Sequence, residues 1–166
     1  MNKKIILSFL VLSAATAAGT AQAVTASTTF PVTALVLTSC AVSATPLAFA
    51  SYDPAASSTI DAANSLLVTC TTGVAYTVGL SVGVGTGATV ATRKMTNVAS
   101  AGNLLTYSLY SDAGRSSLWG NTVGTDTLAA TATATPNTIA VYGRVFAGQN
   151  VPAGAYSDTV TVTVNY

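Results

Sequence analysis

The sequence ends with Thr159-Val160-Thr161-Val162-Thr163-Val164-Asn165-Tyr166, in which polar and apolar side chains alternate without a break. Successive side chains of a β-strand point to opposite faces of its sheet, so this period of two predicts a strand that is buried on one face only. Val160, Val162, Val164 and Tyr166 share the apolar face of that strand.

The rest of the chain follows the same period rather than a helical one. Segments rich in Val, Thr, Tyr and Leu occur at residues 65–70, 74–82, 104–110, 139–146 and 156–166. Clusters of Gly, Pro, Asn, Asp and Ser separate them, as expected of strands joined by turns. No apolar stripe with i, i+3, i+4 spacing continues for three turns. The sequence therefore predicts an all-β sandwich or barrel, with long surface connections at residues 51–64 and 122–137.

Residues 1–23 have the features of a cleaved signal peptide. Two lysines near the start are followed by an apolar stretch over residues 5–18, which is short for a membrane span. Ala21-Gln22-Ala23 then supplies the small residues that signal peptidase recognises. We expect export, with a mature chain that begins at Val24 and forms one domain.

The charge of the mature chain argues against nucleic acid and acidic lipid as partners. Beyond residue 23 the chain has four basic residues, five aspartates and no glutamate. A protein with so little net charge lacks the positive charge with which a polyanion is bound. Low charge together with 50% hydrophobic residues leaves little to keep single molecules apart, as suits a protein that works as an assembly.

Two cysteines, Cys40 and Cys70, are present. In an exported protein such a pair most simply forms one disulfide, worth about 3–4 kcal/mol if its effect is mainly on the unfolded chain. The alternative, a metal or redox site, needs further ligands. The chain has no histidine and no Cys-x-x-Cys spacing.

The residues that could carry catalysis are sparse, and we expect no enzyme and no cofactor. Without histidine, neither a Ser/His/Asp nor a Cys/His arrangement can form. Asp112 and Asp126 could pair in space, but isolated loop carboxylates are more often turn formers. The glycine-rich run at residues 83–87 lacks the lysine of a phosphate loop and opens no helix, which favours a hairpin or flexible loop. Trp119 could be a carbohydrate platform; a half-buried core residue beside a turn at Gly120 is favoured.

A second alternating segment lies near the mature N-terminus. Phe30, Val32, Ala34 and Val36 fall on one face, opposite Pro31 and other residues. Proline has no backbone N–H, so this strand tolerates full pairing on one side only. Periodicity alone favours an ordinary strand of a closed sandwich. The alternative is a strand that belongs in another molecule, because residues 24–34 form a Thr-, Ser- and Ala-rich arm with little bulk to hold it.

Residues 40–166 contain short signals in the order in which a known family has them. The series is Cys40-Ala-Val-Ser-Ala-Thr-Pro-Leu-Ala-Phe49, Tyr52-Asp53, Leu67-Val-Thr-Cys-Thr-Thr-Gly73, Tyr76-Thr-Val78, Arg93-Lys-Met95, Leu105-Thr-Tyr-Ser-Leu-Tyr-Ser-Asp112, Trp119-Gly120, Val141-Tyr-Gly-Arg144 and Pro152-Ala-Gly-Ala-Tyr-Ser-Asp-Thr-Val160. Each signal is weak alone, but together they resemble the spore coat protein U domain family. One departure is that Ala50 follows Phe49, where the family commonly has glycine.

The resemblance implies a subunit of a Csu-type, or archaic, chaperone–usher pilus. Such subunits have an incomplete immunoglobulin-like β-sandwich that lacks its final strand. A periplasmic chaperone fills the gap first, and the N-terminal strand of the next subunit replaces it during passage through an outer-membrane usher, which is donor-strand complementation. The implied donor segment is residues 24–36, with Phe30, Val32, Ala34 and Val36 facing the groove. The implied pilin domain is residues 37–166.

On this reading Val160, Val162, Val164 and Tyr166 line the acceptor groove or pair with the chaperone. The expected function is that of a stalk subunit, exported through the periplasm to the cell surface and serving attachment and biofilm formation. Its partners would be copies of itself or related pilins, the chaperone and the usher. The alternatives are a tip adhesin module, a spore or cyst coat protein, or a self-contained secreted sandwich.

Overall fold

The computed structural model describes residues 22–166. The predicted signal peptide lies outside this range except for its last two residues. The chain divides after Leu35 into an N-terminal part and a body over Val36–Tyr166. Residues 22–35 have no regular secondary structure, and their side chains are exposed.

None of the described residues belongs to a helix with the length and apolar character needed to cross a membrane.

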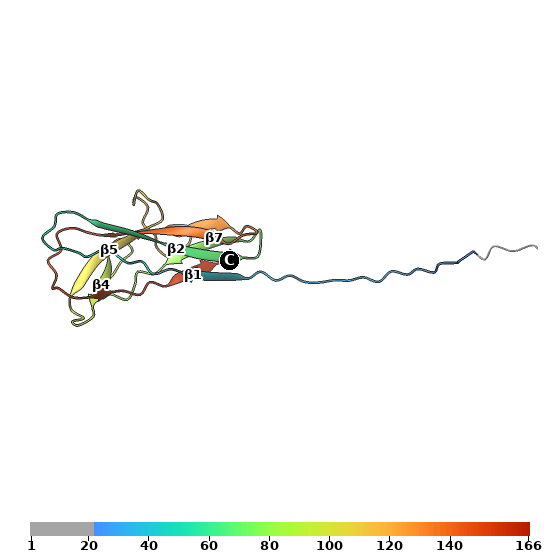
Figure 1. The fold of residues 1–166 in the computed structure, drawn as a ribbon, viewed down its shortest axis with the longest axis horizontal. Coiled ribbons are helices and arrows are strands. Elements are labelled where there is room, and N and C mark those ends of the chain that lie inside the picture. The colour runs from blue at the N-terminus through green and yellow to red at the C-terminus, as the bar shows by residue number, and fades with distance from the viewer. Residues whose placement is uncertain (1–21) are drawn as a thin grey trace, which may run out of the picture. The chain divides into compact units, whose positions relative to one another are not determined.

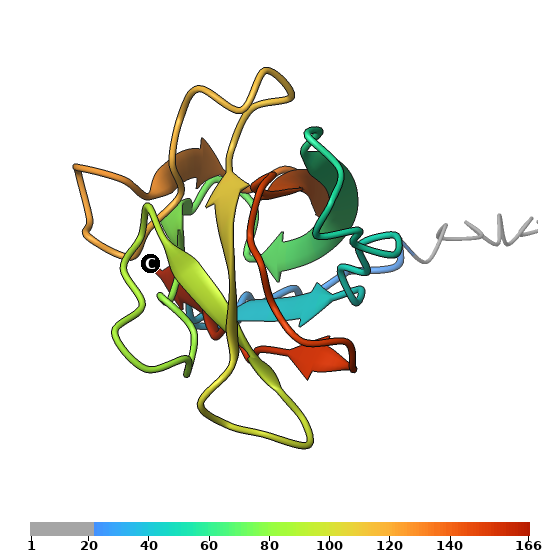
Figure 2. The same cartoon turned by 90° about the vertical axis from the view of Figure 1, so that its left-hand side faces the viewer.

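Nine strands form in the described part of the chain. They are β1 (Cys40–Ala44), β2 (Ile60–Cys70), β3 (Ala75–Leu80), β4 (Arg93–Asn97), β5 (Leu104–Tyr110), β6 (Leu128–Thr131), β7 (Asn137–Val145), β8 (Tyr156–Ser157) and β9 (Val162–Asn165). One sheet has the order β1-β2-β7-β5-β4-β8 and the other the order β6-β3-β9, with antiparallel pairing throughout (Figures 1 and 2). The all-β prediction is confirmed.

Two predicted connections are wrong in part. The connection expected at residues 51–64 ends early, because β2 already begins at Ile60 and pairs there with β7. The connection expected at residues 122–137 contains β6, in which Leu128 and Ala130 pack against the core. In both places, pairing with a distant strand outweighs the weak local preference of a polar or alanine-rich segment.

The segment at residues 156–166, expected as one strand, is divided. β8 pairs with β4 in the six-stranded sheet, whereas β9 pairs with β3 in the three-stranded sheet. The chain therefore crosses from one sheet to the other between Ser157 and Val162.

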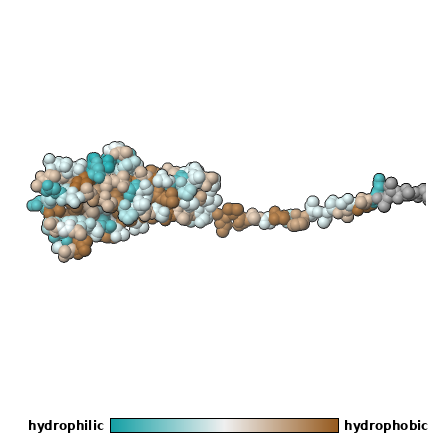
Figure 3. All heavy atoms as spheres, in the orientation of Figure 1, coloured by the Kyte–Doolittle hydropathy of each residue, from teal (hydrophilic) through white to brown (hydrophobic). Residues whose placement is uncertain are grey.

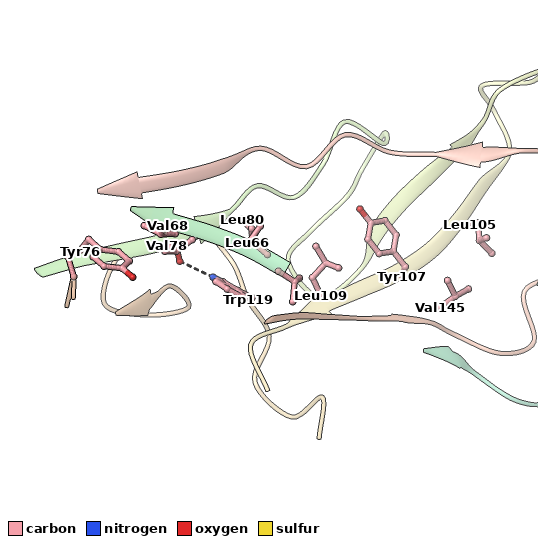
Figure 4. Close-up of a cluster of buried hydrophobic side chains, with 12 residues drawn as sticks. Leu66, Val68, Tyr76, Val78, Leu80, Leu105, Tyr107, Leu109, Trp119 and Val145 are labelled. Atoms are coloured by element: carbon pink, nitrogen blue, oxygen red, sulfur yellow. Dashed lines mark hydrogen bonds between the residues drawn. The ribbon is translucent and has the colours of Figure 1, made fainter. Parts of the chain in front are cut away.

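The core lies between the two sheets and is built mainly from alternate residues of their strands, to which Trp119 and Ala132 are added from the connections. Its buried members are Leu66, Val68, Tyr76, Val78, Leu80, Leu105, Tyr107, Leu109, Trp119, Ala132, Val141 and Val145 (Figure 4). Trp119 is fully buried rather than half-buried, and its Nε1–H donates to the Val78 carbonyl oxygen at 2.8 Å. A ring enclosed in this way is not a surface platform for a sugar.

Arg93 is a charged side chain inside this core. Its guanidinium donates to four carbonyl oxygens, those of Leu80, Ser81, Val90 and Trp119. Burial lowers the pKa of Arg93, and the nearby oxygens of Tyr107 and Asp158 counteract this. These four hydrogen bonds offset the cost of burying the charge, and through them Arg93 joins β3, the loop before β4 and the Trp119 turn into one unit.

Candidate strand-accepting groove

The predicted disulfide between Cys40 and Cys70 is confirmed. The two cysteines are directly opposite each other at one end of the β1–β2 ladder. Thr71 holds the chain just before Cys40. Its backbone N–H donates to Ser39 O at 2.9 Å, and its hydroxyl donates to Leu37 O at 3.3 Å. The chain that leads into β1 is thus tied to the body from residue 37 onward.

Two sheet edges lie next to each other without pairing. β1 is at the end of the six-stranded sheet and bonds to β2 alone, while β9 is at the end of the three-stranded sheet and bonds to β3 alone. β1 and β9 are nevertheless neighbours in space, as Figure 1 shows. In the described body, the sandwich is therefore open along this flank.

An apolar groove of about 430 Å³ occupies the open flank. One wall is the chain at the end of β1 and just after it, at residues 44–49. The opposite wall is the C-terminal chain, at residues 156–160 together with Val162. The floor consists of core side chains from both sheets, including Leu66, Leu80, Leu109 and Val141. A groove of this form exposes apolar side chains that a closed sandwich would cover.

The backbone of the C-terminal chain offers hydrogen bonds toward the groove. Thr161 uses its own N–H and carbonyl oxygen on the β3 side, since it bonds to Ser81 Oγ and Ser81 N at 2.9 Å each. Backbone groups alternate in direction along an extended chain, so those of Val160, Val162 and Val164 point to the open edge. These groups need a partner, from water or from an added strand.

The predicted site residues at the C-terminus are not all in the groove. Val160 and Val162 line it, and Val164 packs against the core farther along β9. Tyr166 is 61% exposed and belongs with Asn165 to a shallow hollow over β3 and β6.

The predicted donor residues are all exposed. Phe30 and Val32 are 79% and 84% accessible, Val36 is 79% accessible, and Ala34 is exposed as well. Figure 3 shows hydrophobic residues, in brown, along the extended chain that contains this segment.

Phe49 is a groove residue that periodicity did not identify. Its ring packs edge-on against Tyr107, with 6.0 Å between centroids, and lies over Gly143, where an added Cβ would be 2.7 Å from Cζ. Phe49 also lines a second hollow of about 630 Å³, whose lining comes mainly from residues 47–54 and 151–156. Phe49 appeared in the sequence only as part of a family signal, because the chain around it forms no strand.

The candidate catalytic residues have structural roles in their loops. Asp112 accepts hydrogen bonds from the N–H groups of Ser117 and Ser116, and these bonds, that of Ser117 above all, hold the pKa of the Asp112 carboxyl below its usual range. Asp126 accepts from Thr122 N at 2.6 Å. Residues 83–87 form a loop before β4. No cluster of three or more metal-ligating side chains occurs among residues 22–166.

Comparison with known proteins agrees with these observations. The sequence matches the Spore Coat Protein U domain over residues 26–163. It is 38% identical over 129 residues to Protein U of Myxococcus xanthus, an alignment that covers 72% of this chain and 71% of that protein.

The fold is similar to that of a chain in the crystal structure of the CsuC–CsuE chaperone–tip adhesion subunit pre-assembly complex, from archaic chaperone–usher Csu pili of Acinetobacter baumannii. The TM-score is 0.60 at 21% identity, and the match covers 79% of this chain and 40% of the other. The domain match, which spans both walls of the groove and the segment before β1, decides the family. The chain belongs to the Spore Coat Protein U domain family.

Proposed function

We propose that this protein is a structural subunit of a chaperone–usher pilus, in which residues 24–36 of one copy fill the groove of another. The observation that carries the proposal is the pair of unpaired edges, β1 and β9, beside an apolar groove. The chain also supplies an exposed alternating segment of the kind that such a groove accepts.

The energetics favour this occupant. Burial of Phe30, Val32, Ala34 and Val36 offers about 5–9 kcal/mol before the cost of ordering the segment is subtracted. The backbone groups of Val160, Val162 and Val164 would gain partners. The Pro31 side chain would lie on the face away from the groove. Proline has no N–H to donate, and this is tolerated in a strand that completes its hydrogen bonds along one edge only.

The similarity to a chain of a chaperone–subunit complex supports a periplasmic chaperone as the first partner. We extend the proposal to an outer-membrane usher, to export through the periplasm to the cell surface, and to a role in attachment and biofilm formation. Among pilus positions, the stalk is favoured over the tip, because a tip subunit does not need to donate a strand.

The test is to make the donor face polar in the full chain. Phe30→Asp with Val32→Asp should abolish polymerisation, measured as fibres by electron microscopy and as polymer ladders on gels. The matched control, Thr29→Asp with Thr33→Asp, adds the same charges to the opposite face and should leave polymers. Fibres of normal length from the Phe30/Val32 variant would contradict the proposal.

A second function, that of a spore or cyst coat protein, is favoured by the family name and by the similarity to Protein U. It predicts localisation to a developmental coat and no complex with a chaperone or usher. Immunolocalisation, together with affinity purification from the periplasm, distinguishes the two functions.

A further inference from the structure

The inner row of the C-terminal chain contains one acidic residue. Tyr156, Asp158, Val160, Val162 and Val164 are all partly buried, and the first four of them line the groove. Asp158 lies in the stretch where the chain crosses from β8 to β9. Within the described structure, residues 158–160 make no backbone–backbone hydrogen bond to either sheet.

Three hydrogen bonds hold the Asp158 carboxylate. Oδ2 accepts from the Tyr107 hydroxyl at 2.7 Å, and Oδ1 accepts from Val84 N at 2.8 Å and from Thr159 N at 2.7 Å. The Tyr107 hydroxyl points from β5 toward the ribbon that joins β8 to β9 (Figure 4). The crossing is therefore fastened to β5 and to the loop before β4 through a single side chain.

The loop before β4 is shaped to receive this carboxylate. Gly83 has φ of +90°, and a Cβ at this position would collide with the Asp158 carboxylate. Arg93 is close, but its N–H groups are directed to carbonyl oxygens, and no Arg93–Asp158 salt bridge forms among residues 22–166. The Asp158 carboxylate is thus held by three hydrogen bonds and not by a buried ion pair.

We propose that Asp158 is a positioning residue for strand acceptance. Through its hydrogen bonds with Tyr107 and Val84, Asp158 holds the crossing against the body. Val160 and Val162 then remain in the groove wall, with their backbone groups directed to the open edge. Without this attachment, residues 158–160, which precede the hydrogen bonds of Thr161 to Ser81, can move into the apolar groove and cover the edge to which a strand must bind. The inference rests on the proposed function, since it assigns a role within the same groove.

The experiment measures binding of a fluorescent peptide of residues 24–36 to the full chain. The full chain carries Phe30→Asp and Val32→Asp, so that its own segment does not compete. In this background Tyr107→Phe removes the phenol–carboxylate bond but keeps the ring that packs on Phe49. We expect the Kd for the peptide to rise about tenfold. Asp158→Ala should weaken binding further, and Asp158→Asn, which keeps an acceptor for Val84 N, should restore part of it.

The matched control is Tyr52→Phe. The Tyr52 hydroxyl accepts from Gln149 N at 2.7 Å, outside the C-terminal chain and outside the groove. Tyr52→Phe should lower the unfolding temperature but change the Kd for the peptide less than threefold. Equal effects of Tyr107→Phe and Tyr52→Phe on Kd would overturn the role of Asp158. No peptide binding to the background protein would instead overturn strand donation itself.

Discussion

At the scale of single residues, the Phe49 ring leaves room only for a glycine at position 143. Phe49 lies over Gly143 so closely that a methyl group at this position would be 2.7 Å from its ring. We expect Gly143→Ala to lower the free energy of unfolding by about 1–3 kcal/mol, because the ring must move off Tyr107. Denaturant titration measures the loss.

A double-mutant cycle tests the cause of this loss. In a Phe49→Leu background the space over Gly143 is less crowded, so Gly143→Ala should cost much less than it does beside Phe49. Equal costs in the two backgrounds would show that the ring is not what excludes the methyl group.

Single residues are predictable from the sequence where one chemistry dominates. The cysteine pair was predictable because export and the absence of other ligands left one simple outcome. Burial of Trp119 was underestimated, since the Val78 carbonyl that accepts its N–H lies 41 residues away in the chain. Asp158 was not identified, because its partners Tyr107 and Val84 are likewise distant in sequence.

At the scale of elements, β2 and β7 are joined by charge as well as by backbone. Arg144 holds Asp61 with two hydrogen bonds, at 2.7 and 2.8 Å, and Arg115 adds a contact at 3.3 Å. The Arg144 hydrogen bond lowers the pKa of Asp61. The pair lies at the surface, so its net contribution is at most about 1 kcal/mol.

The lowered pKa fixes the direction of a pH effect. A carboxyl whose pKa is lower in the folded protein stabilises it above the unfolded pKa, about 3.9, and this contribution is lost as the pH falls through the folded value. Asp61→Asn should therefore be slightly less stable than wild type at pH 7. The difference in the free energy of unfolding should shrink as the pH falls below the unfolded pKa, and it should disappear once the pH is below the folded pKa. A difference that persists at low pH would assign the effect to packing.

The strands that alternate strongly were predictable, and the weakly patterned ones were not. Residues 104–110 were predicted with the boundaries that β5 has. The start of β2, with Asp61, Ala62 and Ala63, has little strand preference and is held by its ladder with β7. The division between β8 and β9 was invisible, because the alternation runs through the crossing while the chain changes sheets.

At the scale of the whole molecule, an open flank makes stability depend on an added strand. A ligand that binds only the folded state stabilises it by about 2.7 kcal/mol at a concentration one hundred times its Kd. The unfolding temperature of the Phe30→Asp, Val32→Asp chain should therefore rise with the concentration of the residue 24–36 peptide. A scrambled peptide of the same composition should have no effect. If neither peptide changes the unfolding temperature, the stability of the open flank does not depend on an added strand.

The disulfide also contributes at this scale, since it links strands at the edge of the body. Cys40→Ser with Cys70→Ser should lower the free energy of unfolding by about 3–4 kcal/mol. Calorimetry with and without a reducing agent provides the check. The reducing agent should not change the unfolding temperature of the double variant, because the sequence has only these two cysteines.

The position of that disulfide has a mechanical consequence. Tension that reaches the body along residues 37–39 arrives at Cys40 and passes through the sulfur atoms directly to Cys70, where β2 ends. The enclosed residues, 41–69, carry none of that load and cannot be drawn out, although extended they would span about 100 Å. A pulled molecule of this protein therefore lengthens by this amount only after reduction, so that its extensibility depends on the redox state of its surroundings.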